Sequence, residues 1–95
     1  MHQIRFAWAK AEKYVRQADL PLKDRLEKEL LVIAQAPFAA DELKGRFHGL
    51  RSHHSNHQGV AYRIVYAVYS QEETLGVLHI GTRENFYKEL ARILE

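Results

Sequence analysis

The sequence predicts a single α+β domain in which an antiparallel sheet is covered on one face by helices. The central observation is Val60–Tyr69, where bulky side chains alternate strictly with smaller ones, as in a strand whose two faces differ. The smaller face carries one cation, Arg63. Because a guanidinium is costly to bury without a partner, we expect the Arg63 face to be open or filled by something anionic, and the bulky face to pack against helices.

The other elements follow from local patterns. Residues 3–8 alternate like a strand, whereas 9–18 and 21–35 place apolar residues at helical spacing. A loop is expected over 38–46, further strands over 47–55 and 74–80, and turns over 56–59 and 70–73. Thr82 is expected to N-cap a final helix. The predicted order is β-α-α-β-β-β-α, with an antiparallel meander and helices on one face.

Composition narrows the class of protein. The chain has 95 residues, of which 46% are hydrophobic and 27% charged, which is typical of one globular domain spanning 1–95. Without cysteine it has no disulfide or thiolate metal site. No apolar run approaches the roughly 18 residues that cross a bilayer, and the N-terminal residues do not resemble a signal peptide. We therefore expect a cytoplasmic protein without a membrane partner.

Positive charge is concentrated in one stretch. The formal net charge is only +2, yet residues 44–63 contain four arginines and lysines, four histidines and no acid. A basic block of this kind indicates an anionic partner such as nucleic acid, and the alternative is chance clustering on a surface.

Several polar residues are expected to converge on the Arg63 face. Alternation from Arg63 suggests that Arg51 and His53 on the preceding strand and His79 on the following strand share its side of the sheet. Arg83 and Tyr87 follow at helical spacing. Arginine binds phosphate, aromatic rings stack on bases, and histidine transfers protons near neutral pH, so this set suits RNA. Cleavage by attack of a ribose 2′-OH would need no metal and no cofactor.

Four segments then resemble the RelE/ParE superfamily of type II toxins. They are residues 41–45 (DELKG), 49–51 (GLR), 61–66 (AYRIVY) and 78–87 (LHIGTRENFY), and the likeness covers about residues 38–94. The resemblance implies a toxin neutralised by a cognate antitoxin. In the RelE branch it implies an endoribonuclease that enters the ribosomal A site and cleaves mRNA by 2′-OH attack, leaving a 2′,3′-cyclic phosphate.

The resemblance also implies roles for individual residues. Arg63 matches the strand arginine that contacts the scissile phosphate, Arg83 the arginine that stabilises developing charge, and Tyr87 the tyrosine that stacks on or orients the base. Paired lysines of that branch fall near Arg51 and His53, which makes His53 the expected general base. The remaining candidates are His54, Asp41 and Glu42 for the base, and Lys44, Arg46, Arg51, His54 and His79 for RNA binding.

Three other interpretations compete with RNA cleavage. ParE-like toxins of the same fold bind and inhibit DNA gyrase without catalysis, but they generally lack the combination of two arginines and a tyrosine. A metal site at His48, His53, His54 and His57 is disfavoured because adjacent strand residues face opposite ways and no acid or cysteine accompanies them. The chain could also be a binding module without activity.

Overall fold

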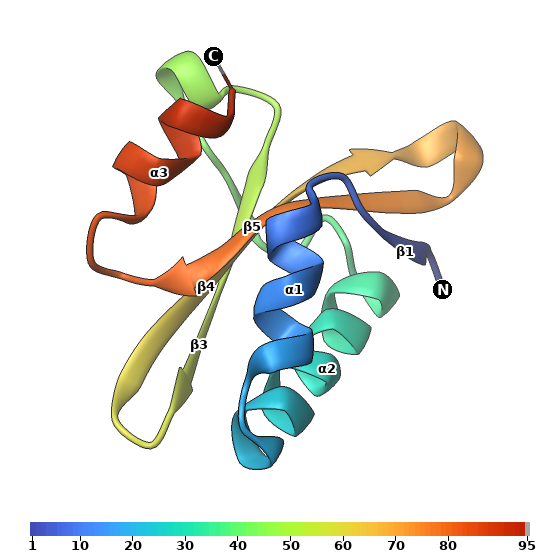
Figure 1. Cartoon of the computed structure of the whole chain (residues 1–95). Helices are drawn as coiled ribbons and strands as arrows, with labels where there is room; N and C mark the ends of the chain where they lie inside the picture. Colours follow the sequence, from blue (N-terminus) through green and yellow to red (C-terminus); the bar gives the residue numbers. More distant parts are fainter. Residues whose placement is uncertain (95) are drawn as a thin grey trace.

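The computed structural model describes residues 1–94, and its elements follow the predicted order (Figure 1). In chain order the helices and strands are β1 (Gln3–Phe6), α1 (Ala9–Gln17), α2 (Leu20–Gln35), β2 (Asp41–Glu42), β3 (Arg51–His57), β4 (Val60–Tyr69), β5 (Thr74–Thr82) and α3 (Phe86–Ile93). The 3₁₀ turns η1 (Gly45–Phe47) and η2 (Ser70–Glu72) lie between strands. The α+β class is confirmed. The short strand β2 lies within the predicted loop.

One sheet contains all five strands in the order β1-β5-β4-β3-β2. Its pairs are antiparallel except at one edge, where β1 runs parallel to β5 and Gln3 lies opposite Thr74. The expectation of an antiparallel sheet is therefore corrected at β1. A tight turn can join only antiparallel neighbours, whereas parallel neighbours need a long connection. Strands β1 and β5 are far apart in the chain, so their connection is long enough for parallel pairing.

The main core lies between the sheet and the first two helices, as predicted. Helix α2 begins at Asp19, whose side chain accepts a hydrogen bond from the Leu22 N–H at 3.1 Å, with Pro21 in the first turn. At its other end, the Tyr66 hydroxyl donates to the Pro37 carbonyl at 2.7 Å. The buried residues of this core are Ala11, Val15, Leu26, Leu30, Ile33, Ala34, Ile64, Tyr66, Leu75, Val77 and Ile80.

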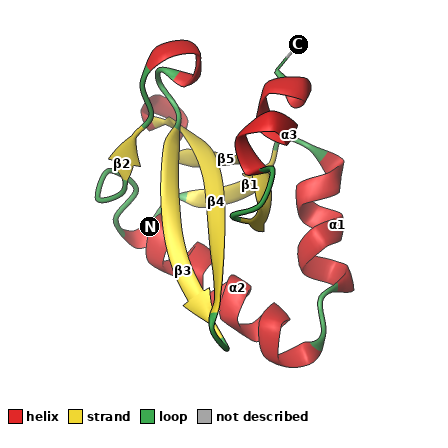
Figure 2. Ribbon diagram, turned by 90° about the vertical axis from the view of Figure 1, so that its left-hand side faces the viewer, coloured by secondary structure: helices red, strands yellow, loops and turns green. Residues whose placement is uncertain are grey.

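Helix α3 packs on the face of the sheet opposite the main core (Figure 1), and Figure 2 shows it next to β5. Phe86 and Leu90 cover the fully buried Val65 in a second, smaller core. The expectation of helices on one face is therefore corrected. Thr82 is not an N-cap either, because it pairs with Tyr62 as the last residue of β5, and the cap position is taken by Asn85 in a left-handed conformation.

A two-residue turn sets the register of β3 against β4. Gln58 and Gly59 both have positive φ, 51° and 81°, as in the tight turns that join twisted antiparallel strands. His57 therefore lies opposite Val60, His54 opposite Arg63, and His53 opposite Ile64. A bulge near Val65 also shifts the register of β5.

Among the described residues, no helix is long and apolar enough to cross a bilayer.

Candidate functional site

The structure brings Arg63 and Tyr87 together on the α3 side of the sheet. Arg63 projects from β4 beside the patch of sheet that α3 covers, and it is half-buried. Its guanidinium carbon lies 5.2 Å from the centroid of the Tyr87 ring, within the range of a cation–π interaction. Tyr87 lies in the first turn of α3 and is 38% exposed. A strand cation and a helix aromatic are thus held together and reach solvent.

His54 lies directly across from Arg63 on β3. Side chains of such opposed residues leave the sheet on the same face, with Cβ atoms about 4.5–5.5 Å apart. Partial burial and the Arg63 charge lower the pKa of His54, and Asp41 on β2 opposes this shift. A lowered pKa keeps the imidazole neutral near pH 7, so His54 can accept a proton there.

The remaining cations of this face are exposed. Arg83 lies in the bend between β5 and α3, and within residues 1–94 its guanidinium has no ion-pair or ring partner. Lys44 occupies the position before η1, and Arg46 covers the Phe47 ring with its guanidinium carbon 5.7 Å from the centroid. Arg46 thus connects through Phe47 to Tyr87, whose ring centroid is 5.9 Å from that of Phe47.

His53 does not join this group, which corrects the predicted face. It lies opposite Ile64 and points under α2, where its Nε2 is 2.6 Å from the Glu29 carboxylate. Glu29 also pairs with Arg25 at 3.3 Å. His53 therefore links β3 to α2. The two-residue turn at Gln58 and Gly59 explains the correction, because a shift of one residue in the pairing of β3 with β4 moves each β3 side chain to the other face of the sheet.

Arg51 likewise lies on the face of the sheet that α1 and α2 cover. Its Nη1 donates to the carbonyls of Ala40 at 2.7 Å and Phe38 at 3.2 Å, and its guanidinium carbon lies 5.1 Å from the Phe38 ring centroid. Its donors hold the loop after α2 against β3. The structure thus separates Arg51 from Arg63.

His79 shares the face of Arg63 but is covered by protein. It is 6% exposed and lies between Trp8 and Phe86, at ring-centroid distances of 5.8 and 4.6 Å. Its Nε2 is 3.2 Å from the Glu89 carboxylate, a contact that becomes an ion pair only when the imidazole is protonated. Burial lowers the pKa of His79 and Glu89 opposes this shift. The expectation that His79 lies exposed on an open face is therefore corrected.

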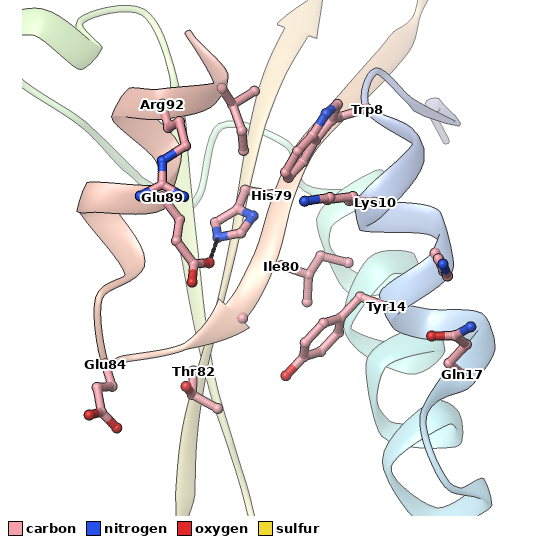
Figure 3. Close-up of a pocket in the computed structure, with 13 residues that line it drawn as sticks. Trp8, Lys10, Tyr14, Gln17, His79, Ile80, Thr82, Glu84, Glu89 and Arg92 are labelled. Atoms are coloured by element: carbon pink, nitrogen blue, oxygen red, sulfur yellow. Dashed lines mark ion pairs between the residues drawn. The ribbon is translucent and has the colours of Figure 1, made fainter. Parts of the chain in front are cut away.

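His79 instead forms the floor of a cleft of about 640 Å³ (Figure 3). Trp8 and Lys10, at the start of α1, face Glu89 and Arg92 of α3 across it. The cleft lies on the side of α3 away from Tyr87, because residues two apart on a helix point in nearly opposite directions. It is separate from the Arg63–Tyr87 pair.

The histidines do not gather into a metal site. His53 and His54 face opposite sides of the sheet, and His48 lies 3.9 Å from Glu42 at an exposed edge. Within the described chain, no three histidine, aspartate or glutamate side chains are grouped as metal ligands. The residues present therefore do not favour the metal interpretation.

Sequence reasoning missed Phe47. Its ring lies 5.9 Å from that of Tyr87, on the same side of the sheet as Arg63. The one available signal was an aromatic residue directly after a cation in the acid-free stretch, an arrangement common in nucleic-acid-binding surfaces.

The fold and the site define a small α+β protein whose C-terminal helix holds a tyrosine against an arginine of the central strand. Residues 6–91 match the family described as the ParE-like toxin of type II bacterial toxin-antitoxin systems. The chain belongs to this family, within the RelE/ParE superfamily.

Solved structures show the same fold at low sequence identity. The chain matches the intact E. coli RelBE toxin-antitoxin complex with a TM-score of 0.71 and 24% identity, over 88% of this chain and 99% of that one. It matches the isolated E. coli RelE toxin at 0.70 and 21%, over 100% of both chains. The RelBE2 toxin-antitoxin complex of Mycobacterium tuberculosis matches at 0.69 and 17%, over 86% and 98%. Comparison with curated proteins gave no match.

Proposed function

We propose that this toxin is an endoribonuclease that cleaves mRNA in the ribosomal A site. The observation that supports this most is the placement of the Arg63 guanidinium against the Tyr87 ring and opposite His54. Within residues 1–94 no carboxylate lies at ion-pair distance from Arg63, so its charge remains available to a phosphate. The shared fold with the E. coli RelE toxin is consistent with this proposal.

The proposed reaction is an intramolecular transesterification. A ribose 2′-oxygen attacks the adjacent phosphorus, the new P–O bond forms as the bond to the 5′-oxygen breaks, and the products are a 2′,3′-cyclic phosphate and a 5′-hydroxyl. His54 removes the 2′-OH proton, and the departing 5′-oxygen takes a proton from water to become the 5′-hydroxyl. Arg63, with Arg83, stabilises charge on the non-bridging oxygens, and Tyr87 orients the base by stacking. No step requires a metal or a cofactor.

His54 is proposed as the base in place of His53. The Glu29 contact holds His53 on the far side of the sheet, whereas His54 faces Arg63. Glu42 also faces away, since it lies opposite Arg51. Asp41 shares the Arg63 face and opposes the lowering of the His54 pKa, so we assign it an electrostatic role.

The proposed partner of the toxin is a cognate antitoxin in the cytoplasm. Two of the matching structures are toxin-antitoxin complexes. An acidic antitoxin segment would complement the exposed cations around Arg63 and block access to them, because opposed charges favour association.

Primer extension on mRNA from a purified translation reaction tests the proposal. We expect cuts that require ribosomes, persist in EDTA-treated toxin, and disappear with the antitoxin. The family description names a ParE-like toxin, and this supports one second candidate, the inhibition of DNA gyrase that the sequence resemblance implies for ParE-like toxins. Intact mRNA together with blocked supercoiling would replace the nuclease proposal with the gyrase one.

A further inference from the structure

The Arg63–Tyr87 pair continues into a longer row of stacked side chains. The Tyr87 and Phe47 ring centroids are 5.9 Å apart with planes tilted by 33°, and the Arg46 guanidinium carbon lies 5.7 Å from the Phe47 ring centroid. We call Arg46, Phe47, Tyr87 and Arg63 the stacking row. It joins η1, which lies between β2 and β3, to β4 and α3.

The row has features that core packing alone does not require. Phe47 is only partly buried where it contacts the second core, and Arg46 is exposed. Within the described chain, neither arginine of the row lies at ion-pair distance from a carboxylate. Phe86 packs edge-on against Tyr87 at 5.6 Å and supports its ring. Aromatic rings interleaved with unneutralised cations are the chemistry that holds single-stranded nucleic acid.

We propose that Phe47 and Arg46 form a second nucleotide site, which takes an unpaired RNA base next to the one held by Tyr87. This site rests on the proposed function, in that the adjacent phosphate is the one cleaved. An incoming base replaces the Arg46 guanidinium on the Phe47 ring, and the displaced guanidinium binds a neighbouring phosphate. Because stacking uses the face common to all bases, the site distinguishes unpaired from paired RNA rather than one sequence from another.

Binding of a labelled 2′-O-methyl RNA oligonucleotide, free and within programmed ribosomes, tests the site. Methylation removes the nucleophile, so binding is measured without cleavage. Phe47→Leu keeps an apolar side chain against the second core but loses the ring, and we expect affinity to fall at least about fivefold, the effect of losing one stacked base. Phe47→Tyr restores the ring and should remain within about twofold of the native protein.

Phe38 offers a matched control, since it is exposed and also covered by an arginine, Arg51, at 5.1 Å. It belongs to the loop on the other side of the sheet, so Phe38→Leu should bind RNA like the native protein. Arg46→Gln should reduce the dependence of log affinity on log salt by about 0.7, the contribution of one phosphate contact to a single strand.

The outcomes separate this site from the nuclease proposal. If the native protein cleaves mRNA and Phe47→Leu binds RNA unchanged, the second site is wrong while the nuclease stands. If Phe47 is needed for RNA binding but no cleavage occurs, the site stands while the nuclease falls. Equal losses for Phe47→Leu and Phe47→Tyr, or for Phe38→Leu, would indicate a structural effect and overturn the site.

Discussion

The two faces of the sheet use the same residue types for different purposes. Under α1 and α2, Arg51 donates to two carbonyls and His53 pairs with Glu29, so their polar groups are satisfied within the protein. On the α3 face, Arg63 lies against the Tyr87 ring, has no carboxylate at ion-pair distance within residues 1–94, and has His54 opposite it. Polar groups that are already satisfied stabilise the fold, whereas a cation with no anionic partner remains available to a ligand.

The difference follows from how completely each face is covered. Helices α1 and α2 lie along the sheet, whereas α3 has eight residues and covers a smaller area centred on Val65. Arg63 lies two residues before Val65 on the same face, at the edge of that cover. A short helix thus leaves room for a ligand beside it and supplies the tyrosine that faces the arginine.

A large difference in cleavage is expected between the two arginines. Arg63→Gln should lower the rate of mRNA cleavage about 10²–10³-fold, the loss expected for one preorganised donor to a developing charge, with stability nearly unchanged. Arg51→Gln should instead weaken folding by about 1–3 kcal/mol, because two carbonyls lose a charged donor, while folded protein cleaves normally. Single-turnover cleavage and urea unfolding measure both. Equal effects of the two variants on cleavage would contradict the distinction.

The His53–Glu29 contact should appear in stability alone. His53→Ala removes a 2.6 Å link between β3 and α2 and leaves Glu29 paired only with Arg25. We expect a loss of about 1–3 kcal/mol in the free energy of unfolding, measured by urea titration. His54→Ala serves as the control, because within residues 1–94 His54 has no such partner on α2 and its replacement should leave the free energy of unfolding nearly unchanged. If His54→Ala destabilised the protein more than His53→Ala, the structural role would belong to His54 instead of His53.

His79 should make stability depend on pH. Burial lowers its pKa in the folded state below the ordinary 6.5, so the unfolded chain binds the proton first as pH falls. The free energy of unfolding should therefore decrease below about pH 6.5, by at most about 1.4 kcal/mol per pH unit for this one group. His79→Gln should flatten that part of the profile. If the free energy of unfolding of the native protein instead increases as the pH falls, the effect of Glu89 on the His79 pKa outweighs that of burial.

Trp8 offers a direct reading of the same titration. It is the sole tryptophan and its ring lies 5.8 Å from His79, so its fluorescence should follow the His79 proton. In His79→Gln this change should be absent, and a change that persists there would assign the titration to another group.

The smallest effect is expected for Tyr87→Phe. The ring that faces Arg63 is kept and only the hydroxyl is lost, so affinity for 2′-O-methyl RNA should change less than about twofold. Tyr87→Leu, which loses the ring, is the matched comparison and should bind more weakly. If the two variants are equally weak, the hydroxyl rather than stacking carries the interaction.

Much of the fold could be predicted because the patterns are local. Val60–Tyr69 is the strand that alternation predicted, and the proline and aspartate near residue 20 mark the start of α2. The parallel edge of β1 and the position of α3 were not predictable in this way. Both depend on packing between segments far apart in the chain, which no local pattern encodes.

The candidate site was harder to predict because it depends on register. The side of the sheet that His53 and His54 face is decided by Gln58, a residue that is not glycine yet adopts positive φ, which is uncommon. A turn longer by one residue would exchange their faces. The sequence predicted that Arg63 and Tyr87 converge on one surface, but their contact and the position of Phe47 beside Tyr87 required the structure.

The adjacent histidines His53 and His54 provide the most direct test of the central claim. That claim is that RNA is cleaved on the face of the sheet covered by α3, and not on the face covered by α1 and α2. The measurement is single-turnover cleavage between pH 5 and 8 by the native toxin, His54→Gln and His53→Gln. We predict that the native rate falls in acid only below about pH 6.5, since burial and Arg63 lower the pKa of His54. His54→Gln should lose about 10²–10⁴-fold of the rate and His53→Gln almost none. Full activity of His54→Gln, or loss confined to His53→Gln, would contradict the account.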